Sequence, residues 1–353
     1  MRIDERDIMF SRMSRKKNTP EYEDYYNKNP NLKIIDDEIR EMPEVDSSET
    51  AFYNPINSPI VSATFNFMAD IKNLVNGPGL SENKIEDSPE NFTSKIKGLA
   101  KYYGAHLCNI TICDESYYYS HRGREDNIYG DKIDKLYKYT IIFAVEMDKN
   151  YIDTAPKLPE SIEVTKGYLD AAIIGMILTY YINHLGYNAR NHMDGNYEMI
   201  LPLVAKKAGL GDIGRHGVLI NEKYGSRVRL GAVSTDLPLI TDDESDFKVS
   251  DFCEICKKCI LTCPAKAIHE EKIIDMNGIE RWQITQEECY KKWRSLGTDC
   301  GICLSTCPFS SNIPIESIEK YKQDPSYAVD IIKKHEETYP IRPFVKDNPE
   351  WLD

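Results

Sequence analysis

The sequence predicts an α+β fold in which a core of mixed helices and strands precedes a small cysteine-rich module. Helical and strand-like apolar patterns follow one another between residues 91 and 240. Eight of the ten cysteines then fall into two runs near the C-terminal end. With 41% apolar and 10% aromatic residues, the 353-residue chain can bury one large core or two ordinary ones.

Composition divides the chain into four parts. Residues 1–90 are polar and rich in Tyr, Asn, Asp, Glu and Pro, and we expect them to wrap around the rest. Residues 91–240 form the predicted core. A charged linker opens the cysteine-rich module at 241–315, and 316–353 form a charged, partly helical tail.

Apolar periodicity predicts the elements of the core in order. Each helix has apolar residues at three- and four-residue intervals, and each strand is a short β-branched or aromatic run. The predicted elements are a helix at 92–103 ending at Gly104, strands at 105–113 and 139–147, helices from about Val164 to Gly186 and from Pro202 to Ala208, and two strands flanking a turn at 222–225.

The two cysteine runs have the spacing of a pair of iron–sulfur clusters. The first reads Cys-x2-Cys-x2-Cys-x3-Cys-Pro, and in such two-cluster modules the last cysteine of a run serves the other cluster. A zinc ribbon or a disulfide framework is the disfavoured alternative, because zinc ribbons use two cysteine pairs. The sequence therefore predicts two [4Fe–4S] clusters, one held by Cys253, Cys256, Cys259 and Cys307, the other by Cys263, Cys289, Cys300 and Cys303.

Charge and targeting features indicate the cellular compartment of the protein and the class of its partners. Thiolate clusters need a reducing compartment, and with neither a twin-arginine signal nor an apolar leader in the sequence we expect a cytoplasmic protein. The longest apolar run, at 171–182, is too short to span a membrane. A net charge of −13 argues against a nucleic-acid partner. The two remaining cysteines, Cys108 and Cys113, are predicted to be buried thiols.

A glycine-rich loop follows the helix at 202–208. Gly209-Leu-Gly-Asp-Ile-Gly214 looks like a dinucleotide fingerprint, but such a fingerprint follows a strand and opens a helix. Here a helical stretch precedes the glycines and a strand-like one follows. Glycines also let backbone approach a flat or bulky ligand, and a plain helix-ending turn is the alternative.

This loop, the segment Gly225–Leu239 and the cysteine runs together resemble the cobalamin-dependent reductases, reductive dehalogenases first and epoxyqueuosine reductases second. The resemblance implies a nitroreductase-like core that binds base-off cobalamin, followed by a ferredoxin-like module with two clusters. It also places Gly209, Gly211 and Gly214 beside the corrin. His216 is the one histidine that could touch the cobalamin, a solvated position in the loop being the alternative.

In the resembled family a tyrosine donates a proton and a nearby cation lowers its pKa. The segment Thr165-Lys-Gly-Tyr168 matches the family's Gly-Tyr position, which implies that Tyr168 is the donor, unless it is merely packed. Arg227 and Arg229 share one face of a predicted strand, so we expect one of them to face Tyr168 and slightly prefer Arg227. A surface salt bridge is the alternative for each arginine.

The resemblance implies an anaerobic oxidoreductase that removes halide from a small organic substrate, R–X + 2 e⁻ + H⁺ → R–H + X⁻, with electrons from a low-potential donor such as ferredoxin or flavodoxin. An epoxyqueuosine reductase is the first alternative. It is disfavoured because that family has an Asp-Tyr pair where this chain has Gly167-Tyr168, and because its tRNA surface should be basic. A non-catalytic electron-transfer or cobalamin-handling protein is the second.

Overall fold

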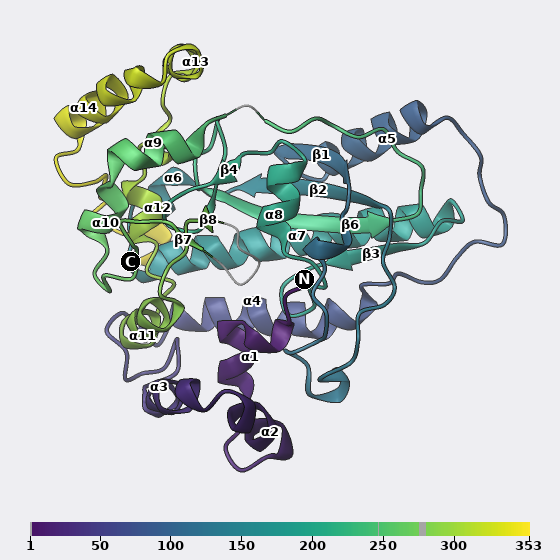
Figure 1. Ribbon diagram of the computed structural model, residues 1–353, viewed down its shortest axis with the longest axis horizontal. Coiled ribbons are helices and arrows are strands. Elements are labelled where there is room, and N and C mark those ends of the chain that lie inside the picture. The colour runs from purple at the N-terminus through teal and green to yellow at the C-terminus, as the bar shows by residue number, and fades with distance from the viewer. Residues whose placement is uncertain (1, 246, 275–279) are drawn as a thin grey trace.

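The computed structural model describes residues 2–245, 247–274 and 280–353. A four-stranded antiparallel sheet lies at its centre, with helices on both faces (Figure 1). The strand order is β1-β2-β6-β3, formed by Leu107–Ile112, Tyr139–Glu146, Val228–Thr235 and Ala189–His192. The central strand β2 is buried from Thr140 to Val145, which is why it is apolar almost throughout rather than alternating.

Two helices cover one face of the sheet. Helix α7 (Leu158–His184) and helix α5 (Pro89–Tyr102) bury apolar side chains against β1, β2 and β6. Helix α7 begins earlier than the predicted Val164, because Pro159 occupies its first turn, where proline is well tolerated. Helix α4 (Ser58–Ile71), from the part expected to wrap around the core, packs on α7.

The opposite face carries helix α8 (Leu201–Lys207), whose Val204 and Ala205 pack on Ile142 and Ala232. The glycine-rich loop then forms a small hairpin of β4 (Asp212–Ile213) and β5 (Leu219–Ile220). The predicted strands around 222–225 therefore do not pair with each other. Strand β5 pairs with β4, and β6 belongs to the large sheet.

The cysteine-rich module contains the helices α9 (Val249–Cys256), α10 (Lys258–Thr262), α11 (Gln286–Leu296) and α12 (Ile302–Thr306). Strands β7 (Ile273–Ile274) and β8 (Glu280–Arg281) pair beside them. Helices α13 (Ile315–Gln323) and α14 (Ala328–Thr338) follow, and Ile318, Tyr321 and Ile331 share one apolar cluster with Phe252 of α9 and Phe309. The chain after residue 315 thus completes the core of the module.

Of the three N-terminal helices, α1 (Met9–Ser14) and α3 (Pro30–Glu41) lie against α11, and α2 (Pro20–Lys28) packs on α3 (Figure 1). Arg12 joins them, because its guanidinium pairs with Asp36 of α3 at 2.5 Å and with Glu287 of α11 at 2.6 Å. The remaining short elements are α6 (Lys149–Ile152) and the 3₁₀ turns Glu5–Asp7, Lys72–Leu74, Glu115–Tyr117, Asp126–Ile128, Pro308–Ser311, Pro325–Tyr327 and Glu350–Leu352.

Neither of the two remaining thiols forms a disulfide, and Cys108 is buried in the core while Cys113 is partly buried. Among the described residues, no helix combines the length and the apolar character needed to cross a membrane.

Candidate functional site

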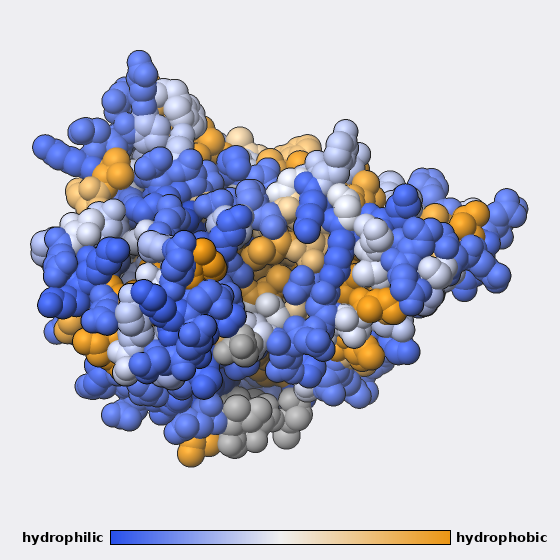
Figure 2. Space-filling view, turned by 90° about the horizontal axis from the view of Figure 1, so that it is seen from above, coloured by the Kyte–Doolittle hydropathy of each residue, from blue (hydrophilic) through white to orange (hydrophobic). Residues whose placement is uncertain are grey.

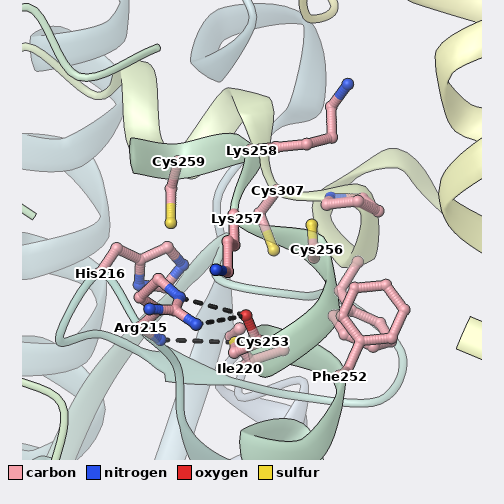
Figure 3. A pocket seen from close by; sticks show the side chains of 12 residues that line it. Arg215, His216, Ile220, Phe252, Cys253, Cys256, Lys257, Lys258, Cys259 and Cys307 are labelled. Carbon is pink, nitrogen blue, oxygen red and sulfur yellow. Dashed lines mark hydrogen bonds between the residues drawn. The ribbon is translucent and has the colours of Figure 1, made fainter. Parts of the chain in front are cut away.

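Four cysteines from two separate segments line one cavity (Figure 3). Cys253 and Cys256 lie on α9, Cys259 on α10, and Cys307 directly after α12. Helix α9 ends at Lys257, whose left-handed backbone (φ 51°) lets α10 start in a new direction. These cysteines are the set that the spacing predicts for the first cluster.

The remaining four cysteines of the module form a second group. Cys263 directly follows α10, Cys289 lies on α11, Cys300 precedes α12, and Cys303 lies in the first turn of α12. Burial, and then the neighbouring Cys300 and Cys263, together raise the pKa of Cys289 to about 12, so these sulfurs act on one another. The pKa of Cys303 is likewise raised by burial and then by Cys289 and Cys300.

The thiols of both groups are hard to ionise without a cation. Burial raises the pKa of Cys253 and of Cys259 to about 12, so a positively charged iron centre would have to favour their thiolates. Among the described residues, no three His, Cys, Asp or Glu side chains are arranged for a single metal ion. Eight thiols in two groups of four suit the donor sets of two cubane clusters.

Arg215 and His216 form one wall of the first cavity. The backbone N–H of Arg215 donates to Cys253 Sγ at 3.4 Å, and its guanidinium donates to the Cys253 carbonyl at 2.8 Å. His216 is only 3% exposed, and burial lowers its pKa to about 4. The alternative of a solvated loop histidine is therefore wrong, because the hairpin turns His216 inward onto the cysteines.

Tyr168 and Arg229 meet between α7 and β6. The guanidinium carbon of Arg229 lies 4.1 Å from the centroid of the Tyr168 ring, within cation–π range. Gly167 makes this approach possible, since a Cβ at that position would lie 3.1 Å from the Cβ of Arg229. Burial raises the pKa of the Tyr168 phenol, and Arg229 opposes that rise.

The slight preference for Arg227 over Arg229 is corrected by the geometry. Arg227 lies one residue before β6, so the alternation of a strand does not align it with Arg229. Its side chain is fully buried and donates to the carbonyls of Met147 at 2.7 Å and Ser310 at 2.8 Å. Arg227 thus joins the core to the segment after Cys307, and its ion pair with the partly exposed Glu146, at 2.9 Å, is made by a fully buried guanidinium.

Two buried carboxyl groups near Arg229 were not predicted. Burial raises the pKa of Glu160 well above its usual range, Asp299 raises it further, and Arg229 lowers it. Burial likewise raises the pKa of Asp299 to about 6, with Arg229 opposing. Asp299 immediately precedes Cys300, so these carboxyls lie between the Tyr168 site and the second cysteine group. No sequence motif marks either residue.

The three predicted glycines approach the protein's own chain. A Cβ at Gly209 would overlap the carbonyl of Asp243, and one at Gly211 would overlap the carbonyl of Ile220. A Cβ at Gly214 would meet the Ile220 side chain at 2.5 Å and His216 at 3.1 Å. These glycines therefore shape the hairpin, and their tight approaches are made to protein atoms.

A groove beside the hairpin has about 610 Å³ of space, within the usual range for ligand sites. Its walls include Ile200 just before α8, Leu203 of α8, Ile213 and Gly217 of the hairpin, and Trp282. On the face seen in Figure 2, hydrophobic side chains gather near the middle, between hydrophilic ones. The groove combines an apolar wall with a rim of charged residues.

Comparisons with known proteins agree with this arrangement. Residues 252–311 match the 4Fe-4S dicluster domain family, which supports two [4Fe–4S] clusters. The chain is 35% identical over 184 residues to a tetrachloroethene reductive dehalogenase of Desulfitobacterium hafniense, covering 49% of this chain and 33% of that protein. It is 31% identical over 127 residues to an epoxyqueuosine reductase of Lactococcus garvieae, covering 35% of each.

The fold has a solved counterpart over nearly the whole chain. A catabolic reductive dehalogenase in complex with 3-bromo-4-hydroxybenzoic acid superposes with a TM-score of 0.77 at 22% identity, covering 96% of this chain and 46% of that one. The matches span about a third of the length of the two sequence relatives. By sequence this chain is a relative of the reductive dehalogenases, and it has their fold.

Proposed function

We propose that the protein is a cobalamin- and iron–sulfur-dependent reductase that replaces halogen by hydrogen in a small organohalide, R–X + 2 e⁻ + H⁺ → R–H + X⁻. The placement of Arg229 over Tyr168, beside the second cysteine group, is the observation that carries this proposal. It provides a proton donor with a fixed countercharge next to an electron-transfer module. The sequence relatives named reductive dehalogenases support the same reaction.

The eight cysteines are the proposed cluster ligands. Cys253, Cys256, Cys259 and Cys307 would hold one cluster, since they line one cavity. The second group, Cys263, Cys289, Cys300 and Cys303, would hold the other, since its sulfurs act on one another electrostatically. Two clusters in one module give a route for single electrons from an external donor such as ferredoxin or flavodoxin.

Tyr168 is the proposed proton donor. Because burial raises the pKa of its phenol, the side chain keeps its proton at neutral pH until the substrate takes it. Arg229 then stabilises the tyrosinate, which limits the cost of losing that proton in a buried site. Arg229 is the cation that lies over the ring of Tyr168, and Arg124 has a smaller lowering effect on the same pKa.

Cobalamin, when bound, supplies low-potential cobalt chemistry that side chains do not. The groove beside the hairpin has the character that a large amphiphilic ring requires, because apolar Leu203, Ile213 and Trp282 lie within a charged rim. Residues of the glycine-rich loop, Asp212, Ile213 and Gly217, contribute to it. These groove residues are the proposed cobalamin contacts.

The test is anaerobic reconstitution with iron, sulfide and cobalamin, followed by a panel of aryl and alkenyl halides with a strong reductant. Halide release that requires both cobalamin and Tyr168 supports the proposal. A parallel assay with an epoxyqueuosine-containing tRNA stem-loop separates the first alternative. Protein that binds cobalamin and cycles its clusters but acts on neither substrate class would favour the non-catalytic role.

A further inference from the structure

His216 carries a buried polar atom that the function above does not use. Its side chain lies on the wall of the first cysteine cavity (Figure 3), and its Nε2 has no hydrogen-bond partner among the described residues. A buried polar nitrogen without a hydrogen-bond partner is unfavourable, because it has lost its hydration and gained nothing in exchange. Its position on a cavity lined by four sulfurs suggests that the missing partner is the occupant of that cavity.

The tautomer of His216 follows from its other nitrogen. The backbone N–H of Val218 points at Nδ1 at 3.2 Å, and because an amide nitrogen only donates, Nδ1 must be the acceptor. In the neutral ring the proton therefore sits on Nε2. The Nε2 of His216, on the wall of the cavity, is therefore an N–H donor that lacks an acceptor in the described part of the chain.

This tautomer argues against His216 as an iron ligand. Binding iron through Nε2 would move the proton to Nδ1, where it would face the N–H of Val218. The same cavity already offers four thiols, which complete a cubane cluster without a histidine.

We propose that His216 donates a hydrogen bond from Nε2–H to a sulfur of the first cluster and thereby raises its reduction potential; this rests on the cluster assignment of the proposed function. Reduction adds negative charge to the cluster, and a donor hydrogen bonds more strongly to the more negative state. The backbone N–H of Arg215, 3.4 Å from Cys253 Sγ, is a second donor on the same wall. His216 is thus a positioning residue that sets how readily the cluster accepts an electron.

The packing around His216 fixes the orientation of its imidazole ring. Gly214 leaves room for the imidazole, since a Cβ there would approach its Cε1 at 3.1 Å. Arg215 is held by Cys253 and lies over Trp282 at 3.9 Å, which restrains the neighbouring backbone. The rigid hairpin therefore holds the donor against the cavity instead of leaving it free to rotate into solvent.

The experiment compares two substitutions of His216, one that keeps only the acceptor at Nδ1 and one that keeps a donor near Nε2. His216→Asn keeps an oxygen near Nδ1 for the N–H of Val218 but reaches no donor to the cavity. His216→Gln places an amide N–H near the position of Nε2. The measurement is an anaerobic redox titration of the protein with both clusters loaded, followed by EPR, and cluster content is checked by iron and sulfide analysis.

In His216→Asn, one of the two midpoint potentials should become more negative, with a roughly tenfold lower ratio of reduced to oxidised cluster at a fixed solution potential, or about 59 mV for one electron. The other midpoint should stay in place and serves as the internal control. His216→Gln should recover most of the shift. Unchanged midpoints in His216→Asn, or equal shifts in Asn and Gln, would overturn the proposal.

A second measurement needs no variant and so stands even if His216→Asn fails to load clusters. Wild-type protein labelled with ¹⁵N-histidine should show a histidine nitrogen coupled to one reduced cluster by pulsed EPR. Absence of any such coupling in fully loaded protein would overturn the proposal. Neither readout depends on dehalogenation, so an inactive protein with a coupled histidine would refute the proposed reaction while leaving this inference in place.

Discussion

The Arg229 guanidinium lies over the face of the Tyr168 ring, with 4.1 Å between the guanidinium carbon and the ring centroid. Two effects oppose each other at the Tyr168 phenol. Burial raises its pKa, and the charge of Arg229 lowers it. The same arginine feels Asp299 and Glu160, whose charges raise its own pKa. The proposed acid and the second cysteine group are thereby joined by one charged cluster.

Replacing Tyr168 with Phe removes only the hydroxyl. Turnover should fall on the order of 10²- to 10⁴-fold, the usual range for losing a general acid, while the clusters and cobalt still accept electrons. Halide release gives the turnover, and visible and EPR spectra under reductant give the electron transfer. Near-normal turnover would move the search for the donor to Tyr117–Tyr119.

The two arginines should separate activity from stability. Arg229→Gln should lower turnover about 10²-fold or more with little change in unfolding, because it removes the countercharge of Tyr168. Arg227→Gln should instead destabilise the protein by about 3–5 kcal/mol, because it breaks buried bonds to Met147 and Ser310. Turnover and anaerobic denaturant unfolding of both variants provide the comparison, and a reversed pattern would contradict the geometry.

Anaerobically prepared protein should contain about eight iron and eight sulfide per chain, as expected for two cubane clusters. Cys256→Ala should remove about half of the iron, since Cys256 lines only the first cavity. The signal of the second cluster should persist. Metal analysis and EPR test this, and zinc at full occupancy would show that the cysteines serve another metal.

His192 should make the protein less stable in mild acid. Burial lowers its pKa well below the usual value near 6.5, with Arg190 and Arg122 adding to the effect. Above pH 6.5, His192 is mostly neutral in both the folded and the unfolded state. Below this pH only the unfolded state takes up the extra proton, so the free energy of unfolding falls by up to about 1.4 kcal/mol per pH unit. His192→Gln should reduce the difference in unfolding free energy between pH 7.5 and pH 5.5, and an undiminished difference would assign the acid sensitivity to other groups.

The sequence predicts short-range features of this protein well. Cysteines two residues apart stay close in any turn of helix, so their spacing along the chain reflects their grouping in space. The strands β1 and β2 and the helix α5 appear close to their predicted bounds, because their apolar patterns are long and regular. Helix α7 begins at Leu158, before the predicted Val164, and Pro159 in its first turn was a signal that the apolar pattern alone did not use.

Features that depend on tertiary packing were missed or misplaced. Whether Arg227 or Arg229 faces Tyr168 depends on where β6 begins, because Arg227 precedes the strand and lies outside its alternation of side chains. Glu160 and Asp299 are far apart in the sequence, and they meet because the segment before α12 packs on the start of α7, where the Asp299 N–H donates to Ser161 Oγ at 2.9 Å. The inward turn of His216 likewise follows from the short β4–β5 hairpin, which the glycine pattern left open.

The most direct test of the proposed reaction is halide release by the wild-type protein, loaded anaerobically with both clusters and cobalamin and supplied with a low-potential reductant. We expect stoichiometric halide and dehalogenated product from at least one organohalide of the panel, dependent on cobalamin and lost in Tyr168→Phe. Fully loaded, reducible protein that releases no halide from any organohalide of the panel would contradict it, as would reduction of the epoxyqueuosine stem-loop in its place.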